Sequence, residues 1–165
     1  MEPVVIAEPD PRWRDAFLSE RERLTTALGE GAVRIEHIGS TAVPGLAAKP
    51  VIDVMVAVRV LGPPDRYLRH VAPLGYRHQP IGSEARLFFV KGAPRTHHLH
   101  IVKEGGEEMR RHLLFRDRLI ACPQLADEYM ALKRELARRF RDDRDAYVRG
   151  KSDFIAKAIE PRTVD

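Results

Sequence analysis

The alternation of apolar and polar residues predicts two strands around a short loop, between residues 33 and 58. In the first strand, Val33, Ile35 and His37 share one face and the intervening residues share the other, because side chains alternate with a period of two. The second segment, VIDVMVAV at residues 51–58, is almost wholly apolar, which is typical of a strand buried on both faces. Its single acid, Asp53, needs a cation, a base or backbone donors within reach, because an unpaired buried carboxylate is costly.

Shorter apolar segments predict the rest of the sheet. Residues 4–8 (VVIAE) and 76–78 favour short strands, and residues 86–91 (RLFFVK) favour a longer one. The turn formed by residues 92–95 then leads into residues 96–102 (THHLHIV), so these last two segments predict a β-hairpin. We expect the sheet core to occupy about residues 31–103.

Helical periodicity predicts one long helix before the sheet and three after it. The first begins at Asp10 as N-cap with Pro11 in the first helical position, and it ends at Gly29. A shorter helix over about residues 65–72 lies between two proline-containing breaks. The C-terminal helices are expected over residues 107–121, 124–140 and 144–159, with Asp143 capping the last. The helical C-terminal part therefore covers about residues 107–160.

The composition narrows the class of protein. At 165 residues, with 44% hydrophobic and 32% charged residues, the chain is expected to form one globular domain over residues 1–165. No apolar run approaches a membrane span, and residues 1–10 do not resemble a signal peptide. A single cysteine, Cys122, excludes an internal disulfide framework and favours a cytoplasmic location.

The net charge is weakly basic, at +4 with a pI near 9.5. An excess of this size suits anionic small molecules but does not by itself indicate nucleic-acid binding. Arginine-rich faces on the C-terminal helices are more simply explained as solvated surface. Nucleic acid is therefore disfavoured as a partner, membranes are not expected, and no protein partner is indicated.

The loop after the first strand is a candidate phosphate site. Gly39 lets the backbone approach a ligand closely, and Ser40 and Thr41 add two hydroxyls to the exposed N–H groups. Lys49, which precedes the second strand, could neutralise a phosphate. A plain turn and a solvated lysine are the alternatives, and the loop's position between two strands makes the two interpretations about equally favoured.

A second candidate joins Asp53 to the histidines of residues 97–102. On a strand, His98 and His100 point to one face and His97 to the other. Two imidazoles and a carboxylate suit a divalent metal such as Mn, Fe or Zn, with His37 as a further ligand or as a residue that orients one. The alternative is a polar strand whose histidines hydrogen-bond to backbone and loops.

The last predicted helix offers a third candidate. Lys151 lies four residues after Tyr147 on an otherwise apolar face, so it either extends to solvent or points at an anion. Arg116 with Asp117, and Lys133 near Tyr129, are more simply structural ion pairs or contacts between helix and sheet. The motifs of P-loop, Rossmann and α/β-hydrolase proteins are absent from the sequence.

Four segments closely resemble the GrpB-like family: HIGSTAVPGLAAKPVIDVMV, RTHHLHIV, HLLFRDRL and AYVRGKSDFI. That family belongs to the nucleotidyltransferase superfamily, whose fold resembles the palm of DNA polymerase β. The resemblance covers nearly the whole chain and implies an α+β fold, a nucleotidyltransferase-like mixed β-sheet flanked by the N-terminal helix and a C-terminal helical cap. The same domain occurs fused to dephospho-CoA kinases, which implies a nucleotide context.

The superfamily pattern also implies roles for particular residues. It has a Gly-Ser motif, then two acids in D-x-D on a strand, then a third acid on a later strand, and these acids hold two Mg ions. Here Gly39-Ser40 matches the motif and Asp53 matches the first acid, but the second acid position is Met55. The third acid falls on the strand that carries His98 and His100, and histidine favours softer metals than Mg.

Three functions stay open for such a site: nucleotidyl transfer with one metal, another metal-assisted reaction on a phosphorylated small molecule, and binding without chemistry. The leading hypothesis is a nucleotidyltransferase-like protein that binds a nucleotide or other phosphorylated small molecule with a divalent metal (Mg, Mn or Zn). Asp53 is its candidate catalytic residue, and Asp53, His98 and His100 are the candidate metal ligands. Gly39, Ser40, Thr41, Lys49 and Lys151 would bind phosphate, with His37 orienting a ligand. The alternative is a non-catalytic module that binds a nucleotide or a protein partner.

Overall fold

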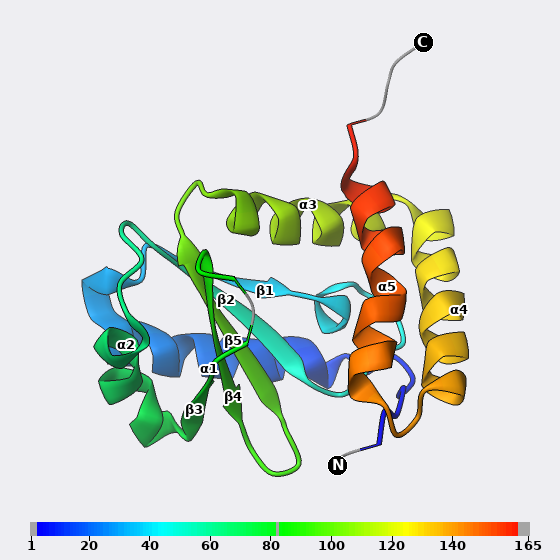
Figure 1. The fold of residues 1–165 in the computed structure, drawn as a ribbon. Coiled ribbons are helices and arrows are strands. Elements are labelled where there is room, and N and C mark those ends of the chain that lie inside the picture. Colours follow the sequence, from blue (N-terminus) through cyan, green and yellow to red (C-terminus); the bar gives the residue numbers. More distant parts are fainter. Residues whose placement is uncertain (1–2, 82, 162–165) are drawn as a thin grey trace.

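A mixed β-sheet forms the centre of the computed structural model, which describes residues 3–81 and 83–161 (Figure 1). Within this part of the chain the strand order is β1-β2-β5-β4-β3. Strands β2 and β5 run parallel, and the other neighbouring pairs are antiparallel. The strands are β1 (Arg34–Ile38), β2 (Ile52–Val58), β3 (Tyr76–Gln79), β4 (Arg86–Lys91) and β5 (His97–Lys103).

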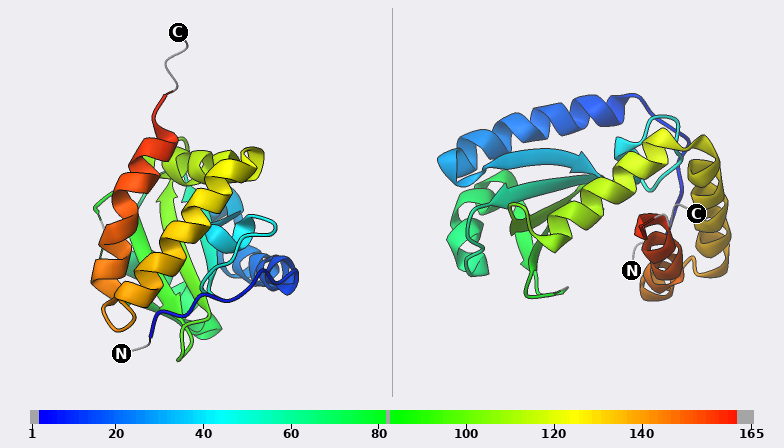
Figure 2. Two further views of the ribbon diagram at one scale, coloured as in Figure 1. Left: turned by 90° about the vertical axis from the view of Figure 1, so that its right-hand side faces the viewer. Right: turned by 90° about the horizontal axis from the view of Figure 1, so that it is seen from above.

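Helices cover both faces of this sheet and one of its ends (Figure 2). Helices α1 (Arg12–Leu28) and α2 (Pro64–Val71) pack on one face, and α3 (Glu107–Ala121) packs on the other. Helices α4 (Pro123–Arg139) and α5 (Arg144–Ile159) lie side by side at one end of the sheet (Figure 1). The α+β architecture is therefore as predicted, with an N-terminal helix and a C-terminal helical cap.

The alternation along β2 divides the core into two layers. Ile52, Val54, Val56 and Val58 pack toward α1, in a cluster that includes its residue Phe17. The intervening apolar positions, Met55 and Ala57, pack toward α3 in a cluster with Met109. Burying one such side chain contributes about 1.5–3 kcal/mol, so the nearly continuous apolar sequence of β2 fixes it at the centre of the sheet.

A buried charged cluster ties α1 to the sheet. The carboxylate of Glu20 is 1% exposed, and it accepts hydrogen bonds from Tyr76 Oη at 2.8 Å and from Lys91 Nζ at 2.9 Å. Burial alone would raise the pKa of Glu20, but the bonds from Lys91 and Tyr76 hold it below its usual value. This cluster joins α1 to β3 and β4 from the face opposite α3.

The helix ends lie within one residue of the predicted signals. Helix α1 begins at Arg12, so its N-cap is Pro11 and not Asp10 as predicted, although the backbone N–H of Arg12 still donates to Asp10 Oδ1 at 2.9 Å. Asp143 caps α5, accepting from Ala146 N–H at 2.9 Å. Gly150 lies inside α5, where an added Cβ would lie 2.5 Å from a terminal carbon of Leu136. The glycine therefore lets α4 and α5 approach closely.

The strand predicted at residues 4–8 is wrong, because within it only Ala7 pairs, in an isolated bridge with Ala48. The N–H of Val4 instead donates to the carbonyl of Arg141 at 2.8 Å, and the Val4 side chain packs in a cluster with α4 and α5. Pro3 and Pro9 flank the segment and cannot donate hydrogen bonds to a strand ladder.

None of the helices in the described part of the chain combines the length and the apolar character that a membrane-spanning helix needs.

Candidate functional site

Asp53 and two histidines meet at the end of β2 that faces α5. The parallel register aligns Asp53 with His98, so Asp53, His98 and His100 share one face of the sheet. His98 Nδ1 and His100 Nε2 each lie 3.1 Å from the same atom, Asp53 Oδ1. The histidine side chains are 10% and 8% exposed, while a quarter of the Asp53 side chain stays accessible.

Two arginines extend this cluster outward. Arg86 Nη1 lies 2.9 Å from His100 Nδ1, and Arg144 Nη2 lies 3.3 Å from His98 Nε2. Glu108 of α3 braces Arg86, with its Oε2 3.8 Å from Arg86 Nε. The result is a chain of polar contacts from one arginine through a histidine to Asp53, and on through the second histidine to the second arginine.

This environment fixes the ionisation of the acid. Burial raises the pKa of Asp53, but the hydrogen bonds from His100 and His98 outweigh it and hold the pKa well below its usual range. Burial also lowers the pKa of His100 to about 4, against the opposing effect of Asp53. At neutral pH an ionised carboxylate therefore accepts hydrogen bonds, and His100 is a neutral donor to it.

The Asp53 cluster forms part of the wall of a cavity of about 290 Å³ between the sheet and helices α4 and α5. Ligand sites for small molecules typically enclose about 300–1,000 Å³, so the cavity is at the small end of that range. Two carboxylates, Asp53 and Asp145, line the cavity. They face a larger set of cationic groups, Lys49, Arg86, Lys133, Arg144 and Lys151.

Two of these lysines lie close to the aromatic ring of Tyr147. Lys151 Nζ is 4.5 Å and Lys49 Nζ is 5.3 Å from the centre of the ring, within the range of cation–π contacts. Burial and the neighbouring Arg144 lower the pKa of both lysines to about 8, although Asp53 opposes this shift. Both predicted phosphate-binding lysines therefore line the cavity, and one helix residue holds them near each other.

Lys133, for which the sequence favours a structural role, also lines the cavity. It is 2% exposed, donates a hydrogen bond to the Ala47 carbonyl, and lies 4.9 Å from the ring centre of Tyr129. Burial, with the repulsion of Lys151, lowers its pKa to about 7. Its structural contacts are present as predicted, but the same side chain also lines the cavity. A lysine on the apolar face of a helix was the signal that could have identified it.

The predicted phosphate loop lies directly beside Asp53. Gly39 has a φ of 73° and a ψ of −173°, a conformation that is almost restricted to glycine. A Cβ at this position would lie 2.7 Å from Asp53 Oδ2, so the glycine lets the loop approach the carboxylate. Ser40 and Thr41 follow in a turn of 3₁₀-helix and line the cavity.

His37 lies apart from the metal-ligand candidates, on the α1 face of the sheet. Its ring stacks on Phe17 with centres 4.7 Å apart, and its Nε2 lies 2.9 Å from Thr41 Oγ1. Burial lowers its pKa to about 4. The structure thus connects His37 to the phosphate loop through Thr41 and does not bring its ring to Asp53.

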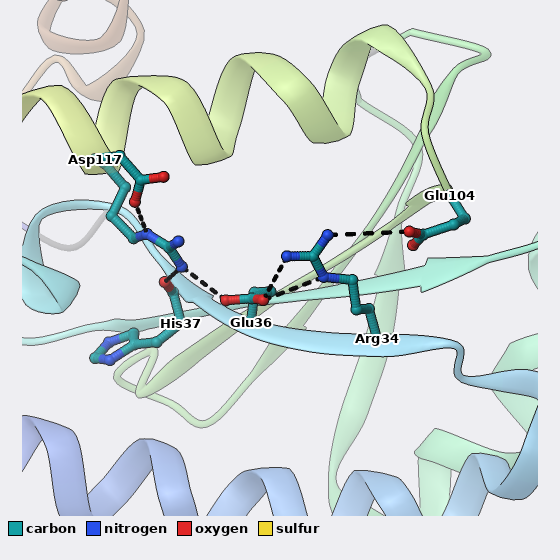
Figure 3. Close-up of polar contacts among 6 residues, drawn as sticks. Arg34, Glu36, His37, Glu104 and Asp117 are labelled. Atoms are coloured by element: carbon teal, nitrogen blue, oxygen red, sulfur yellow. Dashed lines mark hydrogen bonds and ion pairs between the residues drawn. The ribbon is translucent and has the colours of Figure 1, made fainter.

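Figure 3 shows the polar network on the other side of β1. Arg116 of α3 donates to Glu36 at 2.8 Å and to the His37 carbonyl at 3.0 Å, and it pairs with Asp117 at 2.8 Å. Arg34 joins Glu36 at 3.0 Å, which extends the network along the strand. These contacts hold the edge strand β1 against α3, consistent with the structural role predicted for Arg116 and Asp117.

Met55 occupies a closed part of the core. It shares a face with Asp53 but is fully buried, in a cluster with Ile38, Val102 and Met109 beneath α3. A thioether in this cluster provides no oxygen ligand for a hard cation. The described residues therefore hold one three-ligand group, Asp53, His98 and His100, whose candidate ligand atoms lie within 4.8 Å of one another.

Comparisons with known proteins give the wider context. The chain is 39% identical to the UPF0157 protein YqkA of Bacillus subtilis, over 90% of this chain and 44% of that protein. It is 32% identical to a dephospho-CoA kinase of Mycolicibacterium paratuberculosis, over 94% of this chain and 45% of the kinase. The chain thus spans less than half the length of each of these relatives.

The crystal structure of conserved protein GrpB from Enterococcus faecalis is similar over nearly its full length. It matches with a TM-score of 0.86 and 37% identity, over 94% of both chains. The family model described as GrpB protein matches residues 3–161 of this sequence. These two matches confirm the family resemblance read from the sequence motifs, and the chain belongs to the GrpB family.

Proposed function

We propose that this chain binds a nucleotide or another phosphorylated small molecule in the cavity between the sheet and α5, together with a divalent cation on Asp53. The observation that carries the proposal is the crowding of five cationic side chains around a small cavity with two carboxylates. Like charges at short range disfavour one another, which is part of why the pKa values of Lys49, Lys133 and Lys151 are lowered. A polyanion would relieve that repulsion.

The phosphate groups would bind where the loop and the lysines face the same space. Ser40 and Thr41 line the cavity beside Gly39, and loops of this kind present backbone N–H groups and hydroxyls to anions. Lys49 and Lys151 line the same cavity. In this proposal Gly39, Ser40 and Thr41 hold the phosphate, and the two lysines balance its charge.

The donor set also fits a cation. One carboxylate and two imidazoles are ligands that Mn, Fe and Zn accept, and the accessible part of Asp53 faces the cavity. When bound, a divalent cation would neutralise phosphate oxygens and orient the phosphoryl group for attack. Because one carboxylate is present in this group, the ordinary two-Mg arrangement of nucleotidyltransferases is not supported, and Mg is the least favoured of the three candidate metals.

Nucleotidyl transfer to an acceptor is the reaction class that we assign to this site first. The family resemblance and the sheet topology support this assignment: a Gly-Ser loop joins β1 to the antiparallel strand β2, and β5 runs parallel beside β2. The dephospho-CoA kinase relative also supports a nucleotide as the first ligand to test. Hydrolysis of a phosphorylated small molecule would use the same groups.

The single domain and the cytoplasmic location both stay predictions from the sequence.

A second function, binding without chemistry, is favoured by Met55. In the place of the second acid, a fully buried thioether packs under α3, so the site lacks one of the groups that the superfamily uses for metal. A non-catalytic module would still bind an anion through the lysines and Arg144. Nucleic-acid binding through the arginine-rich helices would instead give a steep dependence on salt and little preference for mononucleotides.

The experiment that tests the proposal is a thermal-shift screen of nucleotides and inorganic pyrophosphate, with and without Mn²⁺ or Mg²⁺. A ligand at 100 times its Kd stabilises the native state by about 2.7 kcal/mol, which raises Tm by roughly 5–10 °C for a chain of this size. Asp53→Asn should abolish the metal-dependent part of the rise, whereas Asp145→Asn, the matched carboxylate in the same cavity, should keep it. Equal shifts in both variants would contradict the assignment of Asp53. The absence of any shift with any ligand would contradict the binding proposal.

A further inference from the structure

The two arginines determine which nitrogen of each histidine carries a hydrogen. A guanidinium can only donate hydrogen bonds. His100 Nδ1 and His98 Nε2, the ring nitrogens that face Arg86 and Arg144, must therefore both be acceptors. A neutral imidazole has one N–H, so the hydrogen of each ring lies on the nitrogen that faces Asp53.

The inner ends of the two rings agree with this assignment. His98 Nδ1 and His100 Nε2 both lie 3.1 Å from Asp53 Oδ1, which as an ionised carboxylate oxygen can only accept. Every donor in this series of hydrogen bonds then has an acceptor, from each arginine through its histidine to Asp53. A doubly protonated ring would instead direct an N–H at a guanidinium, which provides no acceptor.

We infer that Arg86 and Arg144 close the Asp53 site to cations by holding both histidines in these tautomers, and that an anion in the cavity opens it. A metal needs a lone pair on each ligand nitrogen. To ligate beside Asp53, each ring must move its hydrogen from the inner nitrogen to the outer one, a change with no net gain or loss of protons. The outer nitrogen cannot carry a hydrogen while an arginine donates to it.

An anion provides the alternative partner for the arginines. Arg86 and Arg144 both line the cavity, and guanidinium groups bind phosphate or sulfate oxygens through strong paired hydrogen bonds. An anion that attracts them away from the rings leaves the outer nitrogens free to take up the hydrogens. Anion and cation binding are then positively coupled, and the coupling is reciprocal. This consequence rests on the proposed cation site, but the tautomer assignment does not.

The tautomers can be measured directly in the ligand-free protein by long-range ¹H–¹⁵N NMR of the histidine rings at pH 7.5. We expect His98 to carry its hydrogen on Nδ1 and His100 on Nε2, two different tautomers on one strand. In Arg86→Met, Asp53 still accepts from His100 Nε2, so the tautomer should stay the same, but the Nδ1 resonance of His100 should shift because this nitrogen loses its hydrogen-bond donor. The resonances of His98 should stay as in the wild type. Finding either ring in the opposite tautomer, or doubly protonated, would overturn the inference whether or not any ligand binds.

The coupling can be measured by calorimetric titration with Mn²⁺, with and without sulfate, which resembles phosphate in charge but chelates metals weakly. We expect sulfate to tighten Mn²⁺ binding about tenfold in the wild type, within the usual range of coupling between sites. Arg86→Met and Arg144→Met should bind Mn²⁺ more tightly without sulfate and lose most of the sulfate effect.

Lys151→Met is the matched control, because it removes one positive charge from the same cavity without touching either histidine contact. Because Lys151 is also a proposed anion ligand, this variant should bind sulfate more weakly, but at saturating sulfate its Mn²⁺ binding should tighten as in the wild type. If all three variants tighten Mn²⁺ binding equally, repulsion alone explains the change and the arginine gate is wrong. If no variant binds Mn²⁺ with or without sulfate, the gate and the proposed cation site both fail, while the NMR result still tests the tautomers separately.

Discussion

Replacing Gly39 by alanine should destabilise the protein through two separable effects. The first is backbone strain, since Gly39 has a φ of 73° and a ψ of −173°, and a residue with a Cβ pays about 1–3 kcal/mol in such a region. The second is contact with the acid, because the new Cβ would lie 2.7 Å from Asp53 Oδ2 and 3.2 Å from its Cβ. The two effects together should lower the free energy of unfolding by about 3 kcal/mol, which lowers Tm by roughly 6–12 °C.

The two effects can be separated with a double-mutant cycle, measured by urea unfolding. In an Asp53→Ala background the contact with Oδ2 is removed and the strain remains, so Gly39→Ala should cost about 1–2 kcal/mol. Gly45→Ala is a control for positive φ, because Gly45 has a φ of 76° with nothing within 4 Å of an added Cβ. An equal cost of Gly39→Ala in both backgrounds would refute the contact between the phosphate loop and Asp53.

Three further variants test other parts of the structure by urea unfolding. Glu20→Gln should lower the free energy of unfolding by about 2–3 kcal/mol, because it leaves Lys91 without its charged partner. Since the pKa of Glu20 is lowered in the folded state, the difference in stability between wild type and variant should be complete above about pH 4.3 and should decrease below it. His37→Phe should reduce the loss of stability between about pH 6.5 and 4, because a folded pKa of about 4 means that acid favours the unfolded state; an unchanged pH profile would refute this. Gly150→Ala should destabilise by about 1 kcal/mol by overpacking against α4, whereas a gain would show that helix propensity dominates.

Local patterns were enough to predict most of the elements but not how they meet. The apolar sequence of β2 and the alternation of β5 predicted that His98 and His100 share a face, and the structure agrees. That β2 and β5 are neighbours, parallel and aligned at Asp53 and His98, depends on long-range pairing, which periodicity does not report. The family resemblance assigned the strand that carries His98 and His100 to the same site as Asp53, but it gave neither the direction nor the register of the pairing.

The position of His37 shows what the alternation along the first strand could predict and what it could not. Ile38 pairs directly with Asp53 across β1 and β2, so paired residues on the same face leave His37 on the opposite one. The pattern of the first strand already separated His37 from Ile38, but without the register this separation could not be related to Asp53. The sequence suggested that His37 orients a ligand or binds the metal directly, because histidine is a common metal ligand. In the structure its ring contacts Thr41 of the phosphate loop instead.

The cationic side of the site was the least predictable part. Arg144 begins a helix 46 residues after His98, and no local pattern indicates that these two side chains meet. Arg86 could have been suggested by its spacing of two from Phe88, which pairs with His100 in the sheet. Lys133 combined a structural contact with a cavity position, and sequence periodicity reports only the first of these.

The most direct test of the account is the position of a bound cation in a crystal grown with Mn²⁺ and sulfate, located by its anomalous scattering. We expect a single strong peak beside Asp53, within coordination distance of a carboxylate oxygen and of one nitrogen each of His98 and His100. Arg86 and Arg144 should contact the anion and no longer donate to the rings. A peak elsewhere, or an anion bound in the cavity with both arginines still on the histidines and no cation at Asp53, would contradict it.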